Sequence, residues 1–477
     1  MELERVDAYR VRIRKKGNMR VPGMIYADQK LLDQISTDRS ADQVANVAHL
    51  PGIVRYSLAM PDIHWGYGFP IGGVAAFDMD NGVISPGGVG YDINCGVRLL
   101  STTIPEGEIR KVKEKLVNTL FSNIPCGLGS SRKDLKLKKK EAASVAEKGA
   151  RWAVEKGFGT QRDLRFTEEN GCLEGASFHV VSERAFERGR NQLGTLGSGN
   201  HFIEVGYVDE IFDTEKAATM GLHLHSAVVT LHTGSRGFGY QICDDSISKM
   251  MTAVQKYGIA LPDRQLCCAP LRSREAKDYF AAMASAANFA FGNRQIITHW
   301  IRESFASVFG DSPQNMGLNQ VYDVTHNIAK FETHTVEGQK KKLCVHRKGA
   351  TRAFPPGHPE IPDEYRAIGQ PVLVPGDMGR YSYVMTGTEQ AAETFYSCCH
   401  GAGRVLSRSR AKKIGKGRAI ERELADVGIY VRHQGKWTLK EEMPEAYKDV
   451  SDVVDVVHKA GLAVKVAKLV PLGVIKG

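Results

Sequence analysis

The 477-residue sequence predicts an α+β fold, a single large compact domain of mixed sheets and helices around a central dinuclear metal site. Three observations predict it. Strand-like and helical patterns do not alternate in the regular order of a doubly wound sheet. No tandem repeat or low-complexity linker divides the chain. Side chains of the metal-ligating type are scattered over residues 92–326 and would meet only within one unit. We therefore expect one domain over residues 1–477, although length alone would suggest two or three.

Apolar, β-branched runs indicate strands, and most of them adjoin a polar residue of interest. In chain order they are the glycine-rich stretch from Val83 to Tyr91 before Asp92, the segment His201–Val205 after the loop Gly194–Gly199, the segment Ala227–Leu231 before His232, and the segment Gln320–Val324 before His326. Helical patterns fill residues 275–309 and 390–397. Residues 130–155 carry six lysines and predict a basic exposed loop that leads into a helix. A solvated helix face explains this charge as well as an RNA contact does.

Charge and composition limit the classes of function. The formal net charge of +10 favours a polyanionic partner, nucleic acid first, although many soluble enzymes are also basic. The nine cysteines form no CxxC pair, so we expect reduced thiols and a cytoplasmic protein. The charged N-terminus is unlike a signal peptide, and no apolar run is long enough to span a membrane. We therefore expect no membrane partner.

Five side chains form the candidate metal site. Asp92 and Cys95 lie three residues apart on a turn, so both can meet one ion. His201, His232 and His326 each lie at the edge of a strand and can converge from other directions. Because a thiolate can bridge two cations, these ligands could hold two ions, which is a common device for phosphate chemistry. Thiolate and imidazole suit zinc, whereas carboxylate and open positions suit manganese. The alternative is a set of hydrogen-bonded core histidines and a small buried cysteine.

A segment around His400 favours an anion. His400 follows one helical pattern and opens another, and Gly401, Ala402 and Gly403 would expose backbone N–H groups there. Arg404 can clamp a phosphate through two hydrogen bonds. His400 is placed to attack phosphorus and form a covalent phosphoramidate. Its alternative roles are a general acid, a further metal ligand or a helix-end residue.

A second segment of this kind is Pro375, Gly376, Asp377 and Met378, ahead of Ser382. An ordinary turn is the alternative interpretation. The chain has neither a GxxxxGK[ST] phosphate loop nor a KxDG motif. Any nucleotide is therefore bound by a less familiar route.

The longest glycine-rich motifs carry a resemblance to a known family. These motifs are MPDIHWGYGFPIGG at residues 60–73 and SPGGVGYDINCG at residues 85–96, with Leu196–Phe202, Val321–Asn327, His400–Arg404 and the terminal Lys476–Gly477. Together they closely resemble the RtcB family of GTP-dependent RNA-splicing ligases, over nearly the whole chain.

The resemblance implies an activity and a set of cofactors. The ligase would join an RNA 2′,3′-cyclic phosphate or 3′-phosphate end to a 5′-hydroxyl end, in tRNA splicing or RNA repair. It would use GTP as co-substrate and two Mn²⁺ ions, and His400 would take GMP as a covalent intermediate. An archease-type protein is the implied activating partner.

The resemblance also assigns residues. Asp92, Cys95 and the three histidines match the metal ligands, with Cys95 bridging. The positions implied around the guanosine nucleotide are Asn200, Phe202, Glu204, Asn327, Ser382, Tyr447 and Lys476. The basic residues implied in activity are Arg236, Arg404 and Lys416. Position 377 departs from the family pattern, which often has serine where this chain has Asp377.

Two other classes of function compete with the ligase. A dinuclear metal-dependent phosphoesterase that hydrolyses RNA ends would use the metal cluster but would leave His400 without a role. A non-catalytic RNA-binding scaffold would explain the charge but not the six ligand-type side chains.

Overall fold

Two β-sheets, each built from segments far apart in the sequence, frame the protein in the computed structural model, which describes residues 2–477. The first sheet has seven strands in the order β1-β2-β3-β4-β5-β13-β12. Their bounds are β1 Leu3–Arg5, β2 Arg10–Ile13, β3 Gly23–Tyr26, β4 Ser57–His64, β5 Ile71–Asp78, β12 Asn327–Val336 and β13 Gln339–Lys348. Burial alternates along the second half of β12, so one face of this strand packs on the core and the other meets water.

The second sheet, which we call the central sheet, has eight strands. Seven follow the order β11-β7-β9-β8-β19-β16-β15, and β18 pairs in parallel with the end of β19. Their bounds are β7 Gly96–Pro105, β8 Phe202–Ile211, β9 Ser226–Thr233, β11 Asn319–Thr325, β15 Pro371–Val374, β16 Ser382–Gly387, β18 Tyr430–His433 and β19 Ala463–Lys476. Strands β7 and β9 are buried over nearly their whole length.

The register of this sheet brings four strand ends to one edge. The first residue of β7, Gly96, pairs with Thr233 at the end of β9 and with Thr325 at the end of β11. The first residue of β8, Phe202, pairs with His232. Because all these pairs are antiparallel, the polar residues at or just outside the four ends gather in one place.

Two short ladders complete the frame. Strands β6 (Val83–Ile84) and β10 (Ala269–Pro270) form one, and β14 (Ala350–Arg352) and β17 (Ser397–Cys399) form the other. The second ladder matters for function, because β17 delivers His400 to the same edge of the central sheet.

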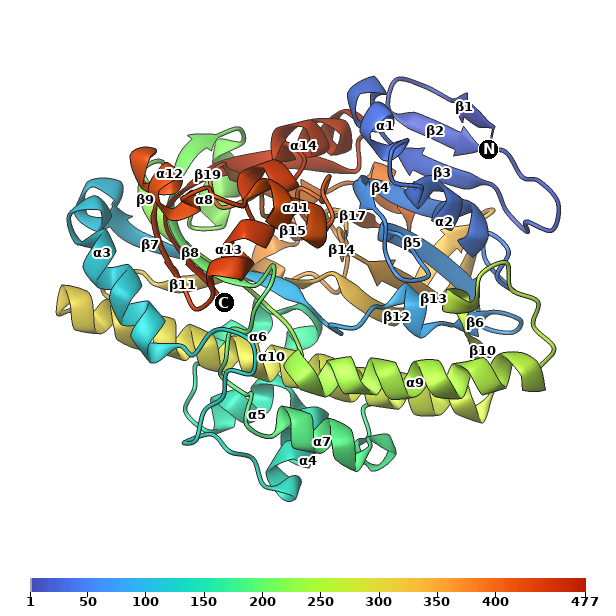
Figure 1. The fold of residues 1–477 in the computed structure, drawn as a ribbon, viewed down its shortest axis with the longest axis horizontal. Coiled ribbons are helices and arrows are strands. Elements are labelled where there is room, and N and C mark those ends of the chain that lie inside the picture. The colour runs from blue at the N-terminus through green and yellow to red at the C-terminus, as the bar shows by residue number, and fades with distance from the viewer. Residues whose placement is uncertain (1) are drawn as a thin grey trace.

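Two long helices, α9 (Arg236–Lys256) and α10 (Arg274–Phe309), run beneath the sheets in Figure 1. Helix α10 begins where the Ser273 side chain accepts the Ala276 N–H, and it ends at Gly310, whose φ is +71°. None of the described helices is both long and apolar enough to cross a membrane. The remaining helices are α1 Gln29–Ile35, α2 Ser40–Val47, α3 Glu106–Asn123, α4 Lys139–Lys148, α5 Ala150–Glu155, α6 Gln161–Arg165, α7 Glu183–Gly189, α8 Thr214–Thr219, α11 Arg408–Ile414, α12 Ile420–Asp426, α13 Lys436–Glu441 and α14 Val450–Lys459.

A buried charge network ties helix α10 to the central sheet. Asp323 of β11 accepts hydrogen bonds from Arg98 of β7 and Arg294 of α10, at Nε–Oδ2 distances of 2.8 and 2.9 Å. All three side chains have no exposed surface. Arg294 also donates to the backbone oxygens of Asn94 and Thr233, which lie beside the gathered strand ends. The network therefore holds the sheet edge on which the polar residues meet.

The predicted fold class is confirmed: the chain forms a single compact domain of mixed sheets and helices. The predicted helix over residues 275–309 is α10. The predicted helix over residues 390–397 is wrong. A 3-10 helix covers Glu389–Thr394, and β17 begins at Ser397. The chain turns between them because Phe395 and Tyr396 adopt left-handed conformations, with φ of +55° and +48°.

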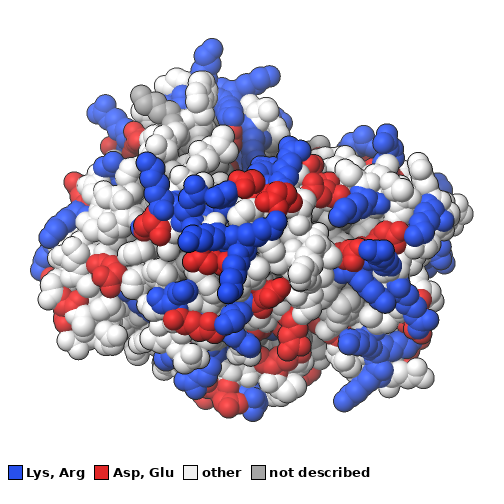
Figure 2. Space-filling view, turned by 90° about the horizontal axis from the view of Figure 1, so that it is seen from below, with Lys and Arg blue, Asp and Glu red and all other residues white. Residues whose placement is uncertain are grey.

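The basic segment of residues 130–155 contains the predicted loop and then α4 and α5. Figure 2 shows the face on which α4, α5 and α7 lie, with Lys and Arg side chains spread over it and Asp and Glu among them. All six lysines of the segment are exposed. Lys139 pairs with Glu183, and Lys148 pairs with Glu155. An RNA contact by this segment stays a prediction.

Candidate functional site

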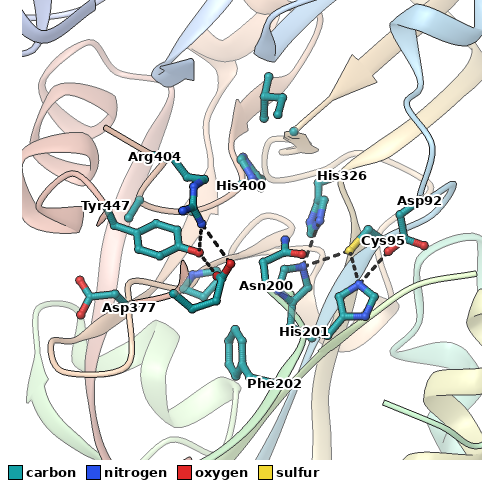
Figure 3. Close-up of a pocket in the computed structure, with 18 of the residues that line it drawn as sticks. Asp92, Cys95, Asn200, His201, Phe202, His326, Asp377, His400, Arg404 and Tyr447 are labelled. Carbon is teal, nitrogen blue, oxygen red and sulfur yellow. Dashed lines mark hydrogen bonds and ion pairs between the residues drawn. The ribbon is translucent and has the colours of Figure 1, made fainter. Parts of the chain in front are cut away.

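A cavity of about 480 Å³ opens at the edge where the strand ends gather. Its size is typical of sites for small molecules and nucleotides. All but two of the residues predicted from the sequence line it. They are Asp92, Cys95, Asn200, His201, Phe202, Glu204, His232, His326, Asn327, Pro375, Gly376, Asp377, Met378, Ser382, His400, Gly401, Ala402, Gly403, Arg404, Tyr447 and Lys476. Figure 3 shows the metal-type ligands on one side and Tyr447 and Asp377 on the other, with Asn200 and His400 between them.

Asp92, Cys95 and His201 form the first half of the ligand cluster, with their ligand atoms within 4.8 Å of one another. A turn brings the first two together, because the Cys95 N–H donates to the Asp92 oxygen at 3.0 Å. Asn94 within this turn has a φ of +52°, a conformation that asparagine tolerates well. Asn327 fixes the turn from the neighbouring strand, since its Nδ2 donates to the Asp92 backbone oxygen at 3.1 Å. The predicted turn is therefore present.

Cys95, His232 and His326 form the second half, again with ligand atoms within 4.8 Å. Cys95 Sγ lies 3.2 Å from His232 Nε2, which lies 3.2 Å from His326 Nε2. Burial holds the pKa of both histidines well below the ordinary value, so both rings are neutral at pH 7. Two neutral rings that aim nitrogens at each other and at a thiol offer lone pairs to a shared cation. Cys95 belongs to both halves, so its thiol joins them into one cluster.

The contacts of His201 support the same conclusion. Its Nδ1 lies 2.9 Å from the Leu196 backbone oxygen, which can only accept, so Nδ1 carries the proton. In the neutral ring Nε2 then has a lone pair, yet it lies 2.7 Å from Asp92 Oδ2. A proton or a cation must lie between these two acceptors. Burial disfavours the charge of Asp92, but the adjacent His201 outweighs burial and lowers the carboxyl pKa to about 2. This buried cluster could therefore bind a metal.

His400 is oriented by a carboxylate that the sequence analysis did not single out. Asp62 Oδ2 accepts from His400 Nδ1 at 2.6 Å, and from the backbone N–H groups of His400 at 2.9 Å and Gly401 at 3.3 Å. Asp62 is fully buried. With Nδ1 engaged, Nε2 is the ring nitrogen left for a reacting atom. The rings of His400 and His326 lie 4.9 Å apart, so the candidate nucleophile adjoins the ligand cluster.

The backbone around His400 differs from the prediction. Residues 400–404 do not open a helix: they form a turn after β17, and α11 begins only at Arg408. Gly403 has a φ of +74°, and a Cβ there would lie 2.2 Å from the Asp62 oxygen. The turn is therefore pressed against the strand that carries Asp62, and any anion would be bound by side chains and turn N–H groups rather than by a helix end.

The far side of the cavity combines acidic, basic and aromatic groups. Lys476 Nζ lies 5.4 Å from the centre of the Phe202 ring, and it donates to the Gly199 oxygen at 3.3 Å. Burial, with the charge of Asp377 as a lesser cause, raises the pKa of Glu204 to about 8. The Glu204 carboxyl group accepts no hydrogen bond from any group that the structure describes. A ligand that offers donors to Glu204 and an acceptor to Lys476 would satisfy both.

Arg404 is fully engaged within the protein. Its Nη1 donates to Glu442 Oε1 at 3.0 Å and to the Tyr447 hydroxyl at 3.1 Å, and its Nη2 donates to the Glu441 oxygen at 2.7 Å. Glu442 is completely buried and also lies 3.6 Å from Lys476 Nζ. A phosphate clamp by Arg404 would require part of this network to open, so the clamp stays a prediction.

The loop of residues 375–382 closes over the cavity. The Gly376 N–H donates to Ser382 Oγ at 3.2 Å. The Asp377 carboxylate accepts from the Gly379 N–H at 3.0 Å and from Arg380 Nε at 2.5 Å. The acidic side chain that departs from the family pattern is therefore held by its own loop.

Arg236 and Lys416 are the two predicted residues that do not line the cavity. Arg236 lies close behind the ligand cluster, where its Nε donates to Thr195 Oγ1 at 3.2 Å and its Nη2 to Ser130 Oγ at 3.3 Å. Lys416 is exposed in the turn that follows α11. Of the two, only Arg236 is placed to act on a group at the cluster without a movement of the chain.

Several lining residues were missed by sequence reasoning. Tyr67 lines the cavity and Asp62 lies behind His400, and both belong to the long motif over residues 60–73, so the motif itself was the signal. Glu442 has no such context, and nothing in its neighbourhood predicts a buried carboxylate. The others are His64, Ile71, Gly90, Tyr91, Ser198, Tyr240, Lys348, Gly349, Arg408 and Val474.

Comparison with known proteins agrees with this geometry. A family profile described as "tRNA-splicing ligase RtcB" matches residues 43–477. The chain is 54% identical to the "tRNA-splicing ligase RtcB" of Archaeoglobus fulgidus, over 100% of this chain and 99% of that protein. It is 48% identical to the protein of the same name from Nanoarchaeum equitans, over the full length of both. It is 51% identical to the "RNA-splicing ligase RtcB" of Mycobacterium tuberculosis, over 91% of this chain and 100% of that protein.

Proposed function

The chain belongs to the RtcB family and is an RNA ligase, and on this premise we propose that it works with GTP and two Mn²⁺ ions. It would join a 2′,3′-cyclic phosphate or 3′-phosphate RNA end to a 5′-hydroxyl end. The observation that carries the proposal is one cavity that holds both the shared-thiol ligand cluster and a histidine oriented by Asp62.

The first step is guanylylation of His400. Its Nε2 attacks the α-phosphorus of GTP, an N–P bond forms, the bond to the bridging oxygen breaks, and pyrophosphate leaves. Asp62 keeps the ring proton on Nδ1 and stabilises the positive charge that the ring acquires. The hydrogen bond from His400 to Asp62 thus fixes the orientation of the ring and leaves Nε2 for the attack.

The next two steps transfer GMP and then seal the RNA. A cyclic end must first be hydrolysed to a 3′-phosphate. An oxygen of that phosphate attacks the phosphorus of GMP, and the N–P bond to His400 breaks. The 5′-hydroxyl then attacks the activated 3′-phosphorus, loses its proton, and releases GMP.

Asp92, Cys95, His201, His232 and His326 are the proposed metal ligands. Bound ions would neutralise the charge that develops on the phosphate oxygens. The donor set by itself also suits zinc, and the preference for manganese comes from the family.

The far side of the cavity is the proposed guanosine site. The Watson–Crick edge of guanine offers two N–H donors beside one carbonyl acceptor. Glu204 lacks a donor within the described chain, and Lys476 is a buried donor across the same space. Phe202 supplies an aromatic ring beside them. Adenine has an amino donor where guanine has its carbonyl acceptor. An acceptor at Glu204 and a donor at Lys476 therefore favour guanine over adenine.

The test is covalent labelling of the protein with α-labelled GTP and Mn²⁺, followed by denaturing electrophoresis. We expect labelling of the wild type and none of His400→Ala, because no side chain in its turn can replace the nucleophile. The exposed His223 provides a matched control, and His223→Ala should label normally. Metal content of His400→Ala should stay normal.

The same assay separates the alternatives. Labelling of His400→Ala at the wild-type level would remove His400 from its role. Release of phosphate from RNA ends without any labelling would favour a phosphoesterase. Ligation measured with and without an archease-type protein tests the proposed activating partner.

A further inference from the structure

Four aromatic side chains in the cavity and in an adjoining hollow have no role in the chemistry above. Tyr91 stacks on Tyr240 with ring centroids 4.8 Å apart, and Tyr67 meets the edge of Tyr91 at 5.7 Å. All three line the cavity. Trp65 lies two residues before Tyr67 and is 48% exposed. We call Trp65, Tyr67, Tyr91 and Tyr240 the aromatic track.

The exposed rings of the track, Trp65 and Tyr240, are not explained by the stability of the fold. Tyr240 lies on α9 and is 44% exposed, although aromatic rings stabilise most when they are buried. The hydroxyl groups of Tyr67, Tyr91 and Tyr240 make no hydrogen bond to any residue that the structure describes. The guanidinium of Arg188 lies 4.9 Å from the centre of the Tyr240 ring. Stacked rings with a cation beside them are typical of surfaces that bind single-stranded nucleic acid.

A second hollow continues the track away from the cavity. It has a volume of about 700 Å³ and is lined by Trp65, Tyr67, Arg39 and Arg264, among others. Tyr67 lines both the cavity and this second hollow, so the two adjoin at this residue. Arg39 pairs with Asp42 on the same wall, whereas Arg264 is exposed and makes no ion pair within residues 2–477.

The position of the track limits what can occupy it. The proposed guanosine site fills the side of the cavity that holds Phe202 and Tyr447. Tyr91 directly precedes Asp92 in the chain, so the track begins beside the ligand cluster, which Figure 3 shows on the side away from Tyr447. This side is open to a second substrate that must reach the cluster and His400 while a nucleotide is bound.

We propose that the aromatic track and the second hollow hold the 3′ strand of the RNA substrate, with the last bases stacked on the rings. This inference rests on the proposed function. The 3′ strand is favoured over the 5′ strand because its terminal phosphate is an anion, which cations bound at the ligand cluster would attract, whereas a terminal hydroxyl is neutral. Stacking is insensitive to base identity, so the track would serve a ligase that acts on ends of differing sequence.

The experiment measures binding of single-stranded RNA decamers by fluorescence anisotropy, with Mn²⁺ present and GTP absent. One decamer carries a 3′-phosphate, and the other carries a 5′-hydroxyl and a blocked 3′ end. We expect Trp65→Ala and Tyr240→Ala each to raise the Kd for the 3′-phosphate decamer about 5- to 150-fold, the range for loss of one stacked base. Tyr240→Phe keeps the ring and should bind as the wild type does.

Two controls make the result specific. Tyr257, which follows α9, is similarly exposed and lies outside both hollows, so Tyr257→Ala should bind both decamers normally. Abasic positions at the 3′ end should weaken binding to the wild type and have little further effect on Tyr240→Ala. Thermal unfolding of each variant identifies a loss of fold.

Three outcomes would overturn the proposal: normal affinity in both alanine variants, equal affinity of the wild type for abasic and intact RNA, or a loss confined to the 5′-hydroxyl decamer. Failure of the proposed function looks different. In that case the wild type does not become labelled by GTP, while the track variants still lose affinity for RNA.

Discussion

Cys95 is the side chain that belongs to both halves of the ligand cluster. Its Sγ lies 3.4 Å from His201 Nε2 and 3.2 Å from His232 Nε2. Burial raises the pKa of its thiol well above the ordinary value, so a thiolate at neutral pH requires a cation beside it. The metal content of the two halves should therefore be coupled through this one residue.

The first prediction follows from this coupling. Cys95→Ala should weaken metal binding at both halves by more than about tenfold, whereas His326→Ala should weaken mainly one. Cys95→Ser should recover little, because a neutral hydroxyl is a much poorer ligand than a thiolate. Elemental analysis after dialysis measures the occupancy. Two retained ions per chain in Cys95→Ala would contradict the bridge.

The second prediction concerns Glu204 and pH. The carboxyl pKa is raised from 4.5 to about 8, so between these values the folded protein holds a proton that the unfolded chain has lost. The free energy of unfolding should therefore fall as pH rises through this window. Glu204→Gln removes the titration, and we expect it to exceed the wild type in stability at pH 9 by on the order of a few kcal/mol.

Urea unfolding at pH 5 and pH 9 checks this expectation, because the two proteins should be nearly equal at pH 5. An exposed residue, Glu187, provides the matched control, and Glu187→Gln should show no such divergence. An equal difference between Glu204→Gln and wild type at both pH values would show that the carboxyl group does not titrate in this window.

At the residue scale, the sequence predicted the metal-type ligands better than it predicted the buried carboxylates that hold other site residues in place. Asp92, Cys95 and the histidines stand out because each is a ligand-type residue beside glycine or asparagine at the edge of a strand. Asp62 was not predicted to orient His400, since the two lie 338 residues apart and only the fold brings them together. Glu442 was missed for the same reason, because its partners Arg404 and Lys476 come from other segments.

At the scale of elements, β19 explains how the end of the chain reaches the cavity. The strand is buried along most of its length and pairs on both sides at its last residues. Lys476 lies opposite Phe202 of β8 and His433 of β18. Chain ends usually fray, but these two neighbours fix the position of the Lys476 ammonium.

The third prediction tests that placement. A hydrogen bond from a charged donor contributes about 1.5–3 kcal/mol, so Lys476→Ala should raise the GTP concentration needed for labelling about ten- to a hundredfold. It should also blur the choice of GTP over ATP and leave RNA binding intact. Lys468 of the same strand pairs with Asp209, and Lys468→Ala is the matched control. If Lys476→Ala keeps the wild-type preference for GTP over ATP, the end of β19 has a structural role only.

The elements were predicted well where local pattern decides and poorly where distant contacts decide. The β-branched runs at residues 227–231 and 320–324 are strands, and residues 275–309 are a helix. Residues 390–397 have a helical sequence, but Arg347 donates to the Phe395 oxygen at 2.8 Å and to Ser397 Oγ at 2.8 Å. These buried hydrogen bonds hold the chain in a turn, and they override local propensity.

At the scale of the whole molecule, the class of fold was predictable and its topology was not. The irregular order of strand and helix patterns excluded a doubly wound sheet. The structure agrees, because both large sheets are mainly antiparallel. The strand order was not predictable, because β7 pairs with β11, more than 200 residues away, and β8 pairs with β19 across more than half of the chain. Such pairings are set by side chains that meet only in the folded state.

The Asp323 network is the clearest case of such a contact, and it carries the last prediction. Asp323→Ala would leave the guanidinium groups of Arg98 and Arg294 buried without a carboxylate, which should destabilise the protein by about 3–5 kcal/mol. Arg294 also holds the backbone oxygens of Asn94 and Thr233, so the variant should lose metal affinity although Asp323 touches no proposed ligand.

The control is Glu423→Ala, which removes a largely exposed partner of Arg418 and should lower the free energy of unfolding by no more than about 1 kcal/mol. Urea unfolding and elemental analysis measure the two effects. A variant Asp323→Ala within about 1 kcal/mol of the wild type, the range of an exposed ion pair, would show that this network does not hold the sheet edge.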